Sequence, residues 1–212
     1  ISLGLVGSEM CIRDSYGPYT ITAEDRLEVR GYRLALTSVA VAQLALAIQW
    51  HQWGSRWLWP WLVVMAVGMG LALRWIHIYL RPLHRALQLF WLVGCGGFAA
   101  LALWLTPGAM VSEAWSRPLA ILALGPFFAS LTGIGFKEFF CFRRPEAIGV
   151  TLLLPLALLG RLTGLLPVSV TLGLLILQAG LLLVLCLRKF PMPAAADVGD
   201  KSVFAHLEQA TL

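Results

Sequence analysis

The sequence predicts an all-α fold, a polytopic membrane protein built as a bundle of six transmembrane helices, and three observations support this class. Hydrophobic residues make up 59% of the 212 residues and charged residues only 13%, whereas soluble domains contain about a quarter charged residues. The mean hydropathy is +0.79. Six apolar segments each have close to the roughly 20 residues that a helix needs to cross the hydrocarbon core. The lipid bilayer is therefore the first expected partner.

The six predicted spans follow one another closely along the chain. They cover residues 32–50, 57–80, 86–105, 118–136, 147–166 and 168–187. The segments are apolar on every face, whereas a transmembrane barrel would need alternating segments of about ten residues. Pro155 predicts a kink in the fifth span. The glycines at 68, 70, 94, 96 and 97 predict close packing between helices.

Lys and Arg are unevenly divided between the two sides that this topology creates. The N-terminal flank, the second and fourth connections and the tail contain Arg26, Arg30, Arg33, Arg81, Arg85, Lys137, Arg143, Arg144, Arg188, Lys189 and Lys201. The other side contains Arg56, Arg117 and Arg161. By the positive-inside rule, both termini are predicted to face the cytoplasm, or the stroma if the membrane is plastidic.

The flanks of the bundle have distinct compositions. Residues 5–15 (LVGSEMCIRDS) match a translated transposase sequencing adapter, so residues 1–15 are interpreted as non-native read-through from assembled sequencing reads, as in a metagenome, with the native start missing. Residues 16–31 form a predicted cytoplasmic segment in which Thr22 and Asp25 have capping-box spacing for a short helix. The transmembrane domain covers 32–187. In the cytoplasmic tail, 188–212, an Ala-rich spacer precedes a short helix expected from Asp200.

Polar residues that could carry function gather on the cytoplasmic side of the second and fourth predicted spans. This cluster comprises Arg74, His77, Arg81, His84, Arg85, Lys137, Glu138 and Arg143. Spacings of three and four place Arg74, His77 and Arg81 on one helix face. Glu138 is the acidic residue near membrane depth in this half, so its expected ion-pair partner is Arg74 or Arg81.

Three interpretations of this cluster stay open. Long basic side chains near helix ends can extend to the headgroups, and positive-inside topology alone would place them there. Alternatively, Glu138 locks the second and fourth spans together, with His77 donating to a backbone carbonyl. The third interpretation is a functional site that binds an anion, a lipid headgroup or a partner. In each case the nearby arginines would lower the pKa of His77 and keep its ring neutral.

Three longer motifs resemble a known family. They are residues 76–85 (IHIYLRPLHR) with 87–91 (LQLFW), residues 131–143 (LTGIGFKEFFCFR) and residues 199–204 (GDKSVF). The chain from Tyr16 to Leu207 is similar to the uncharacterised integral membrane proteins of cyanobacteria and plant chloroplasts, domain of unknown function 2301. The resemblance implies a membrane of a photosynthetic cell, either plasma or thylakoid, and brings no known activity or cofactor with it.

Motifs of familiar chemistry are missing from the sequence. It contains no P-loop, GxSxG or HExxH pattern, and its cysteines lack CxxC spacing, so we expect no catalytic residue, no metal site and no cofactor. The basic residues are explained by topology, without nucleic acid. The first hypothesis for function is a structural or assembly factor that contacts other subunits of a membrane complex. The alternatives are a small-solute transporter or channel, and an enzyme that acts on a lipid or phosphorylated group at the cytoplasmic face.

Overall fold

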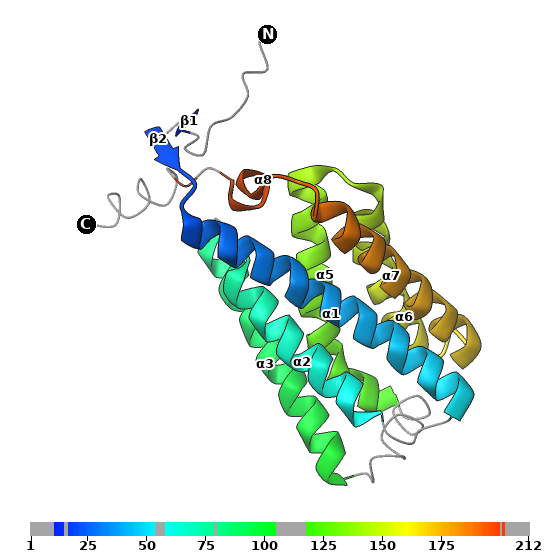
Figure 1. Cartoon of the computed structure of the whole chain (residues 1–212). Helices are drawn as coiled ribbons and strands as arrows, with labels where there is room; N and C mark the ends of the chain where they lie inside the picture. Colours follow the sequence, from blue (N-terminus) through cyan, green and yellow to red (C-terminus); the bar gives the residue numbers. More distant parts are fainter. Residues whose placement is uncertain are drawn as a thin grey trace.

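The computed structural model describes residues 11–14, 17–53, 58–78, 80–104, 118–199 and 201. The described chain is a helical bundle preceded by a small hairpin (Figure 1). In the hairpin, β1 (Cys11–Asp14) pairs antiparallel with β2 (Gly17–Thr20). The predicted all-α class is confirmed for the bundle. The short helix expected from Asp200 falls on residues that, apart from Lys201, lie outside the described part of the chain.

Most of the bundle consists of long apolar helices. The helices in the described part of the chain are α1 (Ala23–Trp53), α2 (Trp59–Trp75), α3 (Arg81–Trp104), α5 (Pro118–Phe142), α6 (Pro145–Leu162), α7 (Val168–Lys189) and α8 (Ala194–Val198). Five of them, α1, α3, α5, α6 and α7, are long and apolar enough to cross a membrane. The apolar helix α2 has 17 residues, which is at the lower limit of length for a span. The count of six spans therefore stays a prediction.

A capping box starts α1. The backbone N–H of Thr22 donates to the Asp25 carboxylate at 2.7 Å, and the backbone N–H of Asp25 donates to the Thr22 hydroxyl at 3.2 Å. These bonds satisfy two of the amide groups that a helix start leaves without intrahelical partners. From there α1 continues unbroken for 31 residues, so the predicted short N-terminal helix is the first part of α1. At 1.5 Å per residue the helix is about 46 Å long, well beyond a hydrocarbon core of about 30 Å.

The second and third predicted spans differ from the observed helices at the turn between them. α2 ends at Trp75, and Ile76 adopts extended backbone with ψ of 132°. α3 begins at Arg81, with Pro82 in its first turn. Proline is tolerated there because N–H groups in the first turn of a helix have no intrahelical acceptor. The predicted continuation of the second helix to residue 80 is therefore wrong, and Arg74, His77 and Arg81 do not share a helix face.

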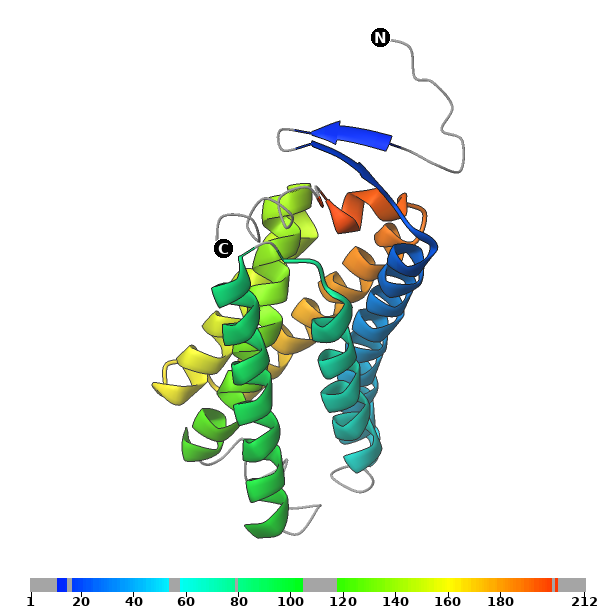
Figure 2. The same cartoon turned by 90° about the vertical axis from the view of Figure 1, so that its left-hand side faces the viewer.

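The helices pack in a closed ring. In the order α1, α2, α3, α5, α6, α7, each packs against the next, and α7 returns to α1. Figure 2 shows α3 in front of α5, with α1 and α2 side by side. Between α3 and α5 the backbones approach closely, because a Cβ atom on Gly97 would lie 2.0 Å from the Ala123 carbonyl oxygen. The close packing predicted from the glycines is confirmed at this contact.

The two ends of the ring differ in charge. At one end, which we call the basic end, α1 and α3 begin and α5 and α7 finish. The short helix α8 lies across this end (Figure 1). The basic residues described there include Arg33, Lys137 and Lys189, which are buried. This end therefore contains buried basic residues, whereas the interior elsewhere is mostly apolar and includes uncharged polar residues such as Gln178.

Candidate functional site

Glu138 is the centre of the buried polar site at the basic end. It lies in the last turns of α5, and its side chain is 0% exposed. Its Oε1 atom accepts a hydrogen bond of 2.6 Å from the Tyr32 hydroxyl and lies 3.3 Å from Lys137 Nζ. Its Oε2 atom accepts from Lys189 Nζ at 2.5 Å. The carboxylate thus connects α1, α5 and α7.

The two lysines are enclosed by aromatic rings. Lys189 Nζ lies 4.9 Å from the centre of the Tyr32 ring and 4.6 Å from that of Phe142. Lys137 Nζ lies 5.5 Å and 5.6 Å from the same two ring centres. Ring faces attract cations at distances below about 6 Å. Tyr32 and Phe142 therefore stabilise the two ammonium groups that Glu138 alone could only partly compensate.

Asp197 of α8 extends the site toward the C-terminal segment. Its Oδ2 atom accepts from Arg33 Nε at 2.8 Å and from Arg33 Nη2 at 2.6 Å, and its Oδ1 atom forms an ion pair with Lys189. The Arg33 guanidinium also donates to the carbonyl oxygen of Met192 at 2.8 Å. Arg33 thus holds both α8 and the turn that leads into it against α1.

Together these groups form one connected set, which we call the ion network. Its members are Tyr32 and Arg33 of α1, Lys137 and Glu138 of α5, Lys189 of α7 and Asp197 of α8. Three cations meet two carboxylates, and all five ionised side chains are buried. Buried ions require partners because the desolvation of an isolated charge costs several kcal/mol. The network therefore fixes these four elements relative to one another at the basic end.

The expected partner of Glu138 was wrong. Among the described residues, Lys137 and Lys189 lie within ion-pair distance of its carboxylate, and neither Arg74 nor Arg81 does. Both arginines have exposed side chains, one at the end of α2 and one at the start of α3. The ion pair of Glu138 therefore joins α5 to α7 and not to α2. The reason is that α7 continues to Lys189, two residues beyond the sixth predicted span, and buries that side chain.

Other members of the predicted cluster lie apart from the ion network. His77, in the connection after α2, has Nε2 3.5 Å from the Glu28 carboxylate of α1. Burial lowers the pKa of His77, and the negative charges of Glu28 and Asp25 oppose this shift. The pKa is therefore lowered as predicted, but the main cause is burial of the ring and not the neighbouring arginines. Arg85 is exposed on α3, and Arg143 is exposed just after α5 with a φ of 49°.

A histidine does donate to a backbone carbonyl, but it is His84 and not His77. The Nε2 atom of His84 lies 2.7 Å from the carbonyl oxygen of Leu73, in the last turn of α2. Carbonyls at a helix end lack intrahelical partners. His84 of α3 therefore joins the end of α2 to the start of α3 across the turn.

Four members of the ion network were missed in the sequence: Tyr32, Arg33, Lys189 and Asp197. Arg33 carried a usable signal, since it lies inside a predicted span, where ionised side chains are paired. Asp197 is the acidic residue of the Ala-rich segment, and the prediction of a spacer there is wrong because this segment forms α8. Lys189 falls in the predicted cytoplasmic tail, because its charge marks the end of the sixth predicted span.

The chemistry open to the site is limited by its own contacts. Glu138 and Asp197 accept hydrogen bonds from basic side chains, and Tyr32 donates to Glu138, so the polar atoms of the network bind one another.

A cavity of about 110 Å³ lies near the other end of the ring, and the described residues that line it do not include those of the ion network. Ligand atoms of Asp25, Glu28 and His77 lie within 4.8 Å of one another. Asp25, however, is bound to Thr22 and Lys201.

Comparison with known proteins identifies the family of the chain. The profile of a family described as uncharacterized integral membrane protein (DUF2301) matches residues 71–206. This range contains α3, α5, α6, α7 and α8 and therefore most of the ion network. No curated protein and no solved structure matches the chain. The chain belongs to the DUF2301 family of uncharacterized integral membrane proteins.

Proposed function

We propose that this protein is a structural or assembly factor of a membrane complex in a photosynthetic cell. The observation that carries the proposal is the ion network, in which five buried ionised side chains of the basic end bind one another and hold four elements together. Such a network gives a rigid bundle. Among the described residues, those that line the cavity include no member of the network.

The surface around the ion network supports a docking role. Arg81 and Arg85 are exposed at the start of α3, and Arg143 is exposed just after the neighbouring α5. Phe136 and Phe140 of α5 are 47% and 75% exposed, with ring centres 5.9 Å apart. Arginine and aromatic residues are enriched in protein interfaces. We infer that this basic and aromatic surface, on the cytoplasmic or stromal side, contacts an acidic surface of a partner subunit.

A charge-reversal experiment tests this role. The full chain is expressed in a cyanobacterial host as wild type, as the double variant Arg81→Glu with Arg85→Glu, and as the control Arg26→Glu with Arg30→Glu, which makes the same change on exposed positions of α1. After mild detergent extraction, we expect wild type and control to migrate in a large assembly on native gels. The α3 variant should migrate as the free protein with an unchanged melting temperature.

Two outcomes would contradict the assembly role. If wild type already migrates alone, the protein has no stable partner, and solute flux or turnover in proteoliposomes becomes the appropriate measurement for the transporter and enzyme alternatives. If both double variants shift equally, the basic residues act through headgroup attraction, which depends on the number of positive charges and much less on their position.

A further inference from the structure

A carboxylate of the chain itself occupies a basic site at the end of the bundle. Asp197 of α8 binds Arg33 of α1 through its Oδ2 atom, which lies 2.8 Å from Nε and 2.6 Å from Nη2, and it binds Lys189 of α7 through its Oδ1 atom. The side chains of Arg33 and Lys189 are 6% and 1% exposed. A guanidinium and an ammonium group that together bind both oxygens of one carboxylate also suit the oxygens of a phosphate group.

The segment that carries Asp197 is attached to the bundle mainly by ionic contacts. We call residues 190–199 the clasp, which contains α8 and the turn before it and lies across the basic end (Figure 1). Among the large apolar side chains of the clasp, only Val198 is buried. Beyond the clasp, Lys201 binds the Asp25 carboxylate of α1 at 2.8 Å through a side chain that is 32% exposed. Segments with few buried apolar contacts open at a lower free energy than the whole fold.

Opening of the clasp changes the charge of the ion network. Without Asp197, the cations of Arg33, Lys137 and Lys189 meet Glu138 as the one remaining carboxylate of the network. The network then has two uncompensated positive charges, which attract an anion. Lys189 is the last residue of α7, a helix long and apolar enough to cross a membrane, and the ends of such helices lie near the lipid headgroups. The bilayer is therefore the nearest source of a phosphate group.

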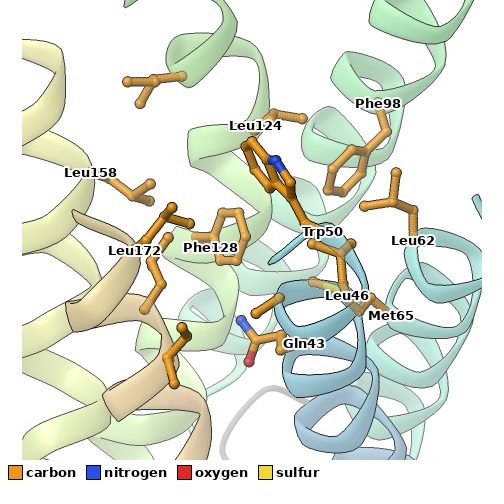
Figure 3. Close-up of a pocket in the computed structure, with 14 residues that line it drawn as sticks. Gln43, Leu46, Trp50, Leu62, Met65, Phe98, Leu124, Phe128, Leu158 and Leu172 are labelled. Carbon is orange, nitrogen blue, oxygen red and sulfur yellow. The ribbon is translucent and has the colours of Figure 1, made fainter. Parts of the chain in front are cut away.

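We propose that Arg33 and Lys189 form a phosphate-binding site that Asp197 occupies while the clasp is closed, and that an anionic lipid headgroup takes this site when the clasp opens. The cavity at the other end of the ring offers no comparable site, because the described residues that line it are apolar or aromatic apart from Gln43 (Figure 3). The binding of lipid by this site does not depend on the assembly role.

Amide hydrogen exchange tests whether anionic lipid opens the clasp. The amide groups of Ala196 and Gly199 are bonded within the clasp, to the carbonyl oxygens of Pro193 at 3.3 Å and of Ala195 at 2.9 Å. A five-residue helix is too short to persist once it leaves the bundle, so exchange at these amides measures opening. The full chain is placed in nanodiscs of phosphatidylcholine alone and of phosphatidylcholine mixed with phosphatidylglycerol. Attraction to an anionic membrane corresponds to about fivefold for each basic residue near it, so we expect exchange in the clasp to be about fivefold faster or more in the anionic nanodiscs, with the middle of α7 unchanged.

Matched variants assign the lipid effect to the site. Arg33→Gln should exchange rapidly and equally in both membranes, because it loses both the clasp contact and the phosphate site. Arg188→Gln removes the same charge from a 56% exposed side chain that pairs with Glu146, and it should keep the lipid effect. Lys201→Gln should raise exchange by about twofold to fivefold in both membranes and also keep the effect.

Three results overturn the proposal. The first is equal exchange of wild type in the two membranes, which needs no variant. The second is equal loss of the lipid effect in Arg33→Gln and Arg188→Gln, because the effect then depends only on the number of charges. The third is faster exchange in the middle of α7, because the whole bundle is then destabilised. Faster clasp exchange in neutral nanodiscs with sodium phosphate than with sodium chloride, at equal ionic strength, would support the phosphate site but overturn lipid as its source.

Discussion

Glu138 of α5 and Lys189 of α7 form an ion pair of 2.5 Å although 51 residues separate them in the sequence, and both side chains are at most 1% exposed. The pair joins two helices that α6 separates along the chain. With Tyr32 and Lys137 it forms the centre of the ion network. The stability of the basic end therefore depends on whether this carboxylate keeps its charge.

Removal of that charge should destabilise the bundle. Glu138→Gln leaves Lys137 and Lys189 in a desolvated site with one compensating carboxylate fewer, so we expect the free energy of unfolding to fall by about 3 to 5 kcal/mol. Thermal melting of the purified protein in detergent measures the change. The control is Glu28→Gln, on a side chain that is 37% exposed. A melting temperature of Glu138→Gln equal to that of wild type would show that the pair does not stabilise the fold.

The docking of α8 should depend on Asp197. Asp197→Asn keeps the shape of the side chain and removes the charge that Arg33 and Lys189 bind. We expect amide hydrogen exchange to rise in residues 190–199 and to stay unchanged in the middle of α7, because the contact to α1 is weakened locally. Equal exchange in both proteins would mean that the carbonyl contacts of Arg33 are sufficient to hold the segment.

Gly97 and Gly96 provide a matched test of helix packing. A Cβ atom at Gly97 would overlap the carbonyl oxygen of Ala123, whereas one at Gly96 would meet nothing within 4 Å. Gly97→Ala should therefore lower the free energy of unfolding by about 1 to 3 kcal/mol through overpacking. Gly96→Ala should be neutral or slightly stabilising because alanine favours helix. Comparable melting temperatures of the two variants would contradict the close contact of α3 and α5.

Acid should destabilise the protein through His77. Burial lowers the pKa of His77 in the folded state, so the unfolded chain binds the proton more readily than the folded chain does. Stability should therefore be complete above the unfolded pKa of about 6.5 and should fall as the pH decreases below it. The melting temperature from pH 8 to pH 5 should fall less in His77→Gln than in wild type. His51→Gln, at an exposed position of α1, is the control, and parallel curves for all three proteins would refute the assignment.

Sidedness can be measured by cysteine labelling. In a variant without native cysteines, Leu27→Cys at the basic end and Gln52→Cys at the other end are both exposed positions of α1. The positive-inside rule predicts that a membrane-impermeant maleimide labels Gln52→Cys in intact cells and labels Leu27→Cys only after the membrane is opened. The reverse pattern would invert the predicted orientation.

The sequence predicts the helices well and their ends poorly, for a physical reason. Apolar length identifies a span, since lipid requires it. The end of the fourth span was predicted at Phe136 because Lys137 and Glu138 are charged, yet α5 continues to Phe142. Those charges are buried in the ion network, so polarity did not mark the end of the helix.

The candidate site was predicted only in part. Lys137 and Glu138 were identified because ionisable residues near a span need partners. Their partners Lys189 and Tyr32 depend on which helices are neighbours in the ring, and hydropathy along the chain does not determine that order. Pro82 did carry local information, because a proline in the first turn of α3 explains why Arg74 and His77 do not continue onto that helix.

The contact between Arg33 and Asp197 can form only late in synthesis. These residues are 164 positions apart, which at 5 to 20 residues per second is on the order of 10 to 30 s of synthesis. During that interval the first span is already made, and its arginine must be hydrated by water or held by lipid phosphates. The first span is therefore fixed in place only after α8 has been synthesised. Ribosome stalling before Asp197 should trap a chain whose first span is still able to move.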